Sequence, residues 1–181
     1  MDNSPRFSVT KLEAARRQLE VAIELWFFDR DAVSIHTLAS AAYQVLADLS
    51  KDRGLEPMLT TREGLKDRIR PGMEAEAYKM FSEAENFFKH ADRDPTETIE
   101  FRPGSNQPIL WEASARYREL TGERVPALEA MYWWFILTHP QYYILPEHQL
   151  PTFTQSQSQF VPNGKQAFFR DYLTYAKTYR P

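Results

Sequence analysis

The chain has 181 residues, of which 43% are hydrophobic and 26% charged, and its net charge is −3. This length and composition predict one globular domain with a buried core. The net negative charge argues against non-specific binding to nucleic-acid backbones, because such binding needs clustered Lys and Arg. There is no cysteine, so disulfides, thiolate catalysis and thiolate metal sites are excluded. The N-terminus lacks the apolar region of a secretory leader and no apolar run is long enough to cross a bilayer, so a cytoplasmic protein is expected.

The N-terminal part predicts two long helices. Thr10 and Glu13 have the spacing of a capping box, and apolar residues follow at helical intervals over 10–28. After a short polar break, Asp31 can cap a second helix whose apolar stripe reaches Leu49. Because the link is short, the two helices are expected to form an antiparallel hairpin.

Three further elements are expected before residue 102. A short helix is predicted over 61–69, and a third long helix over 73–90, ending before Pro95 because the residue preceding a proline disfavours helical angles. The alternation of polar and apolar residues in 96–101 predicts a brief extended segment.

The C-terminal part is rich in aromatic residues and prolines. Ser105 can cap a helix that runs to Leu120, with Gly122 as its stop. Pro126 is typical of the first turn of the next helix, which is strongly apolar and reaches Leu137.

The last 40 residues differ in character from the rest. Segment 140–163 has one carboxylate, no Lys or Arg and four prolines, and it contains the low-complexity run "FTQSQSQF". It is predicted to be a long irregular region, of a kind that is often functional or ordered by a partner. A final helix is expected over 164–179, carrying Tyr172, Tyr175 and Tyr179.

Together these elements predict an all-α fold: an antiparallel helical bundle of about six or seven helices with a long irregular aromatic C-terminal region. We expect a single helical domain over 1–181, with a bundle core in 10–101 and an aromatic-rich helical extension in 102–181. The final 40 residues are expected to wrap the bundle or to dock on a second subunit.

One stretch, "NFFKHADRDP", carries side chains suited to chemistry. If the third long helix packs antiparallel to the second, its end lies beside the start of the second helix, which carries His36. His90 could then act as a general acid or base, because imidazole titrates near neutral pH. Asn86, one turn earlier, could position a substrate, and Lys89 and Arg93 could offer positive charge to a phosphate. Each is a candidate catalytic residue.

Two other interpretations of these residues stay open. His36 and His90 with Asp92 could bind a divalent metal, since imidazole and carboxylate suit several such ions, although no established ligand spacing is present. Alternatively, His36 is a hydrogen-bonded histidine of the core and His90 a stabilising residue at a helix C-terminus. No cofactor is predicted, and phosphate-loop glycine patterns are absent, so no nucleotide cofactor is expected.

The stretches "RDAVSIHTLASAAYQVL" and "NFFKHADRDP" resemble a group of bacterial helical proteins of unassigned activity with an Asn-x-x-Lys-His signature. More distantly, the chain is similar to the HEPN superfamily over 10–101. That resemblance implies a metal-independent endoribonuclease that dimerises around a shared site, with an arginine shortly before a histidine. His90 matches the histidine and Asn86 the polar residue, but positions 83–85 are Glu, Ala and Glu, so the arginine is missing.

The sequence therefore favours a helical interaction module, a self-associating homodimer with a polar His/Asn/Asp cluster at one end of the bundle. A protein partner or a second copy of the chain is expected, and no association with a membrane is expected. The alternatives are a HEPN-type endoribonuclease or RNA-binding protein, and a metal-binding protein or hydrolase that uses His36 and His90.

Overall fold

The computed structural model describes residues 6–66, 71–90, 95–142 and 146–178. These residues form seven α-helices of eleven residues or more, the five-residue helix α3 and four short 3-10 helices, with no strand. The α-helices are α1 Lys11–Phe27, α2 Ala32–Asp52, α3 Arg62–Lys66, α4 Glu74–Lys89, α5 Asn106–Thr121, α6 Pro126–Thr138, α7 Leu150–Phe160 and α8 Gly164–Thr178. The 3-10 helices are Pro103–Ser105, Pro140–Tyr142, Glu147–Gln149 and Val161–Asn163. The all-α prediction is confirmed.

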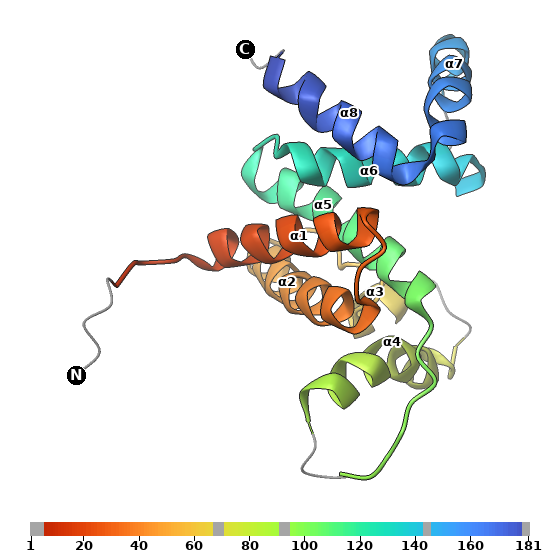
Figure 1. Cartoon of the computed structure of the whole chain (residues 1–181). Coiled ribbons are helices and arrows are strands. Elements are labelled where there is room, and N and C mark those ends of the chain that lie inside the picture. The colour runs from red at the N-terminus through yellow and green to blue at the C-terminus, as the bar shows by residue number, and fades with distance from the viewer. Residues whose placement is uncertain (1–5, 67–70, 91–94, 143–145, 179–181) are drawn as a thin grey trace.

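Helices α1 and α2 form the expected antiparallel hairpin (Figure 1). The capping box at the start of α1 is complete: the Glu13 amide donates to the Thr10 hydroxyl at 3.2 Å, and the Thr10 amide donates to the Glu13 carboxylate at 2.8 Å. At the start of α2, the Asp31 carboxylate accepts from the Ser34 amide at 2.7 Å. These bonds satisfy amides that a helix leaves unpaired at its first turn.

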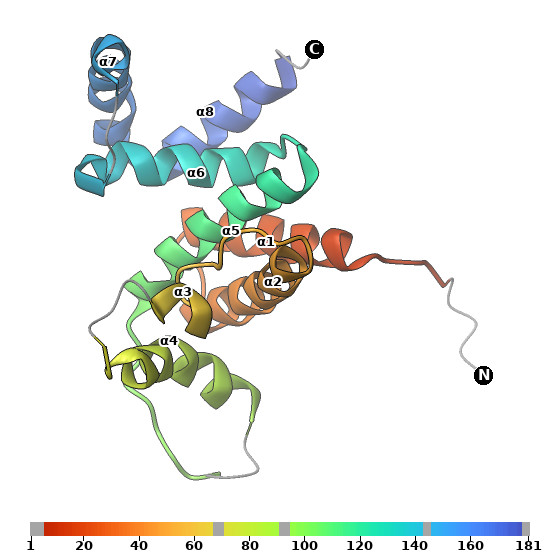
Figure 2. The same cartoon turned by 180° about the vertical axis from the view of Figure 1, so that it is seen from behind.

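The core lies between α1, α2, α5 and α6. Figures 1 and 2 show α1, α2 and α5 packed together, with α4 beside α2 on one side and α6 beside α5 on the other. Each large apolar side chain buried here contributes about 1.5–3 kcal/mol to stability. The largest that are fully enclosed are Leu19, Ile23, Phe27, Leu46, Met58, Leu110 and Met131.

Two details differ from the sequence predictions. Ser105 makes no side-chain cap to α5, because its hydroxyl donates instead to the Arg102 carbonyl at 2.8 Å within a 3-10 turn. Segment 140–163 is more regular than predicted, since it contains α7 and three 3-10 turns. Pro151 lies in the first turn of α7, where a missing amide proton breaks no helical hydrogen bond, and no proline interrupts 152–160.

The first turn of α8 is joined to the end of α1. The Lys165 ammonium lies 2.6 Å from a carboxylate oxygen of Asp29, donates to the Trp26 carbonyl at 2.7 Å, and lies 4.1 Å from the centre of the Trp26 ring. One turn later Phe169 stacks on Phe27, with 4.3 Å between ring centres. The beginning of α8 is therefore fixed to the bundle.

We expect Lys165→Met to lower the free energy of unfolding by about 1–2 kcal/mol, because it removes a charge-assisted hydrogen bond and a cation–π contact while keeping the apolar stem. Urea denaturation followed by circular dichroism measures this difference. Lys177→Met, at the exposed end of the same helix, is the matched control. Equal stability of the two variants would contradict the assigned role of Lys165.

No helix in the described part of the chain has both the length and the apolar character needed to span a bilayer.

Candidate functional site

The predicted approach of α2 and α4 is present in the structure. The ring of Phe88, in the last turn of α4, lies 5.7 Å from the ring of His36, in the second turn of α2. Phe101, which follows the return from α4, lies 5.1 Å from the same imidazole and 5.2 Å from Phe88. The end of one helix thus lies against the start of the other, as the sequence analysis expected.

His36 is not available to a substrate, because only 2% of it is exposed. Its Nδ1 lies 2.8 Å from Oδ1 of Asn106, whose own amide nitrogen donates to the Ala32 carbonyl at 3.0 Å. That second bond fixes the amide orientation, so Oδ1 accepts and Nδ1 of His36 carries the proton. Nε2 is then an acceptor, and it is buried with no hydrogen-bond partner in the described part of the chain.

Burial lowers the pKa of His36, because a charged imidazolium is poorly solvated there. The hydrogen bond to Asn106 and the charge of Glu85 oppose this shift, and the charge of Lys89 adds to it. His36 is accordingly a neutral core histidine that links the starts of α2 and α5.

The other candidates lie at the exposed end of α4. Asn86, Lys89 and His90 are all exposed. The Lys89 ammonium is paired with the Glu85 carboxylate one turn earlier. His90 has extended backbone angles of −130° and 125°, so the alignment that a continuing helix would give it with Asn86 does not hold. Asp92 and Arg93 lie outside the described residues.

Metal binding gains no support from this region. Across the described residues, no three His, Asp or Glu side chains are placed so that they could share a metal ion. The metal and RNA hypotheses remain predictions that no feature of this region favours.

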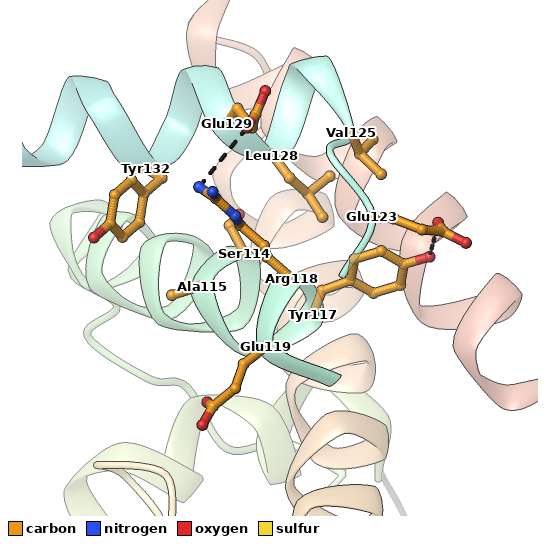
Figure 3. Close-up of a pocket in the computed structure, with 10 residues that line it drawn as sticks. All are labelled: Ser114, Ala115, Tyr117, Arg118, Glu119, Glu123, Val125, Leu128, Glu129 and Tyr132. Carbon is orange, nitrogen blue, oxygen red and sulfur yellow. Dashed lines mark hydrogen bonds and ion pairs between the residues drawn. The ribbon is translucent and has the colours of Figure 1, made fainter. Parts of the chain in front are cut away.

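A cavity of about 350 Å³ lies between α5 and α6, and Figure 3 shows its lining. Glu129 accepts from Nε of Arg124 at 2.7 Å and lies 3.8 Å from Arg118, whose side chain reaches across from α5. The Tyr117 hydroxyl donates to Glu123 at 2.7 Å, and this bond helps raise the pKa of Tyr117 to about 12, after the larger effect of burial. Since these charged groups are engaged with one another, the cavity is best explained as a polar joint between helices.

A second cavity, about 960 Å³, is an apolar groove between α6, α7 and α8. We call it the C-terminal groove. Figures 1 and 2 show α7 and α8 diverging from α6 as two arms, and side chains from all three helices line the space. Its apolar lining consists of Trp133 and Leu137 from α6, Phe153 and Phe160 from α7, and Phe168, Tyr172 and Tyr175 from α8.

Polar contacts hold both α7 and α8 to α6. The Gln157 side chain on α7 donates to the Leu137 carbonyl at the end of α6, at 2.9 Å. The Tyr172 hydroxyl on α8 donates to Glu129 at 3.4 Å, and burial is the main cause that raises the pKa of Tyr172 to about 12. The far end of α8 is less covered, since Tyr175 is 61% exposed.

The sequence pointed to part of this groove. The sequence indicates that the charge-poor segment 140–163 is unusual and places Tyr172 and Tyr175 on the last helix, but it predicts neither α7 nor the contribution of Trp133. The signal for α7 was Pro151 followed by aromatic residues seven apart, at 153 and 160, on one face of a helix.

Comparisons of the chain with protein-family models, with curated proteins and with solved structures find no match. The candidate site must therefore be interpreted from its own chemistry.

Proposed function

We propose that the protein is a helical interaction module that self-associates through the C-terminal groove. The observation that carries this proposal is the groove itself: about 960 Å³ of mostly apolar space with six aromatic side chains in its lining. Helix α7, which forms one wall, has neither a charged nor a buried residue. Protein interfaces are depleted of charge and enriched in Tyr, Trp and Phe at their centres.

The chemistry of the lining favours protein over nucleic acid. Its one arginine, Arg124, is already bound to Glu129, and its one carboxylate, Asp171, would repel a phosphate. Phosphate binding depends on cations that are free to replace counterions. An apolar, nearly uncharged surface is the expected occupant.

A second copy of this chain fits that description. In a twofold dimer each residue near the axis faces its own counterpart, so a charge there would meet a like charge. From residue 149 to residue 161 the chain has no charged side chain. This surface can therefore pair with itself without electrostatic cost.

We expect Trp133→Ala to weaken self-association by more than tenfold, since a tryptophan at an interface centre commonly contributes 2 kcal/mol or more. Sedimentation equilibrium over a range of protein concentrations measures the dissociation constant. The matched control is Phe81→Ala on α4, because Phe81 is 44% exposed and Trp133 is 41% exposed. A wild-type protein that is monomeric at every concentration would refute self-association, and equal effects of the two variants would refute this surface.

A further inference from the structure

The residues that line the C-terminal groove from α7 and α8 have the spacing of helix surfaces that pack against another helix. On α7 the lining residues Phe153, Ser156 and Phe160 are three and four residues apart. On α8 the lining residues Phe168, Tyr172 and Tyr175 are four and three apart. Residues at these intervals form ridges on one helix face, and such ridges pack into the grooves of another helix. This spacing therefore suits a helix as the occupant of the groove.

Helix α7 is only partly covered, with Phe153 and Phe160 half-buried against the core. It has eleven residues, and helices shorter than about 12–15 residues are marginal in water unless they pack against something. None of its residues is buried, and Leu150 at its start is 44% exposed. Its polar positions are filled by Gln, Ser and Thr, of which Ser and Thr favour helix only weakly. A partner that packs on α7 would supply the missing stabilisation.

We infer that α7 of a second copy fills the C-terminal groove, so that α7 and α8 of two copies form one intermolecular four-helix bundle. This inference rests on the self-association proposed above. By symmetry each α7 is both a wall of its own groove and the occupant of the other, so the two α7 helices lie at the centre and the two α8 helices flank them.

The dimensions and charges agree with this arrangement. Helix α7 is about 16 Å long, enough to cover the stripe from Phe168 to Tyr175, which spans about 10 Å. The central pair of helices is uncharged. Of the charged side chains that line the groove, Asp171 lies on α8 and Arg124, which precedes α6, is paired with Glu129.

Single-cysteine variants give a direct test, because the chain has no cysteine of its own. Ser156 lies near the middle of α7 and lines the groove, so in an antiparallel pair its counterpart lies close to it. With the full chain under mild oxidation, Ser156→Cys is expected to form a covalent dimer in high yield. Gln44→Cys, on the exposed face of α2, should form no covalent dimer under the same conditions.

A charge at the same position provides the second measurement. Ser156→Lys would bring two ammonium groups together, and we expect it to weaken association by at least tenfold in sedimentation equilibrium. Thr154→Lys is the matched control: Thr154 is exposed, does not line the groove and is on the opposite side of α7. Circular dichroism of each variant checks that the helices are retained.

The outcomes separate the two proposals. A wild-type dimer that neither cross-links through Ser156→Cys nor responds to Ser156→Lys would overturn the four-helix arrangement and leave self-association intact. A wild-type monomer would overturn both, and native mass spectrometry would then show whether an apolar small molecule occupies the groove instead.

Discussion

Replacing Asn106 by alanine is expected to lower the free energy of unfolding by about 2–4 kcal/mol. The side chain is 1% exposed and makes two hydrogen bonds, one from Nδ1 of His36 and one to the Ala32 carbonyl. Its removal would leave the His36 imidazole buried with neither ring nitrogen bonded, because Nε2 already has no partner in the described part of the chain. Each buried polar group left without a partner costs about 1–3 kcal/mol.

Chemical denaturation of the two proteins at pH 7.5 measures this loss. Gln107→Ala is the control, since Gln107 is the next residue of α5 and is half-buried with no assigned role. A loss no larger than that of the control would show that the amide is not what joins α2 to α5. Asn106→Asp offers a further check, because an aspartate keeps the acceptor for His36 but loses the donor to Ala32.

This link illustrates what sequence alone could and could not predict. The helices with strong local signals were predicted to within a few residues: the capping box of α1, Asp31 before α2, and Pro126 at the start of α6 all act locally. His36 and Asn106 are 70 residues apart, and nothing near either residue indicates the other. Such a pairing depends on tertiary packing, so the sequence left the role of His36 open.

The C-terminal groove could be predicted from the sequence only in part. Its charge-poor character was visible in the sequence, because composition is a property of the segment itself. Its shape was not, since it depends on the angle between α7 and α8, and that angle is set by contacts such as Lys165 with Asp29 and Gln157 with Leu137. An unusual composition thus indicated where an interface could lie, but only the fold defined what could fill it.

The second large effect concerns pH. Burial depresses the pKa of His36, so the folded protein binds a proton at this site less readily than the unfolded chain does. The stability contributed by the neutral imidazole is fully present above the unfolded pKa of about 6.5. It is lost as the pH falls through that value towards the lower folded pKa, with a slope no steeper than about 1.4 kcal/mol per pH unit for one proton.

We therefore expect the wild-type protein to lose more stability between pH 7.5 and 5 than His36→Gln, which keeps a donor for Asn106 but does not titrate. Thermal unfolding at matched ionic strength measures both. Direct NMR titration supplies the independent check: the His36 imidazole should titrate below its value in the unfolded chain, and its Nδ1 should carry the proton at neutral pH. An imidazole that titrates at or above the unfolded value would refute the argument.

Because Phe88 and Phe101 pack on this ring, protonation of His36 should loosen the packing first where the end of α4 meets α2. Amide exchange in α4 should accordingly increase at low pH more than exchange in α1.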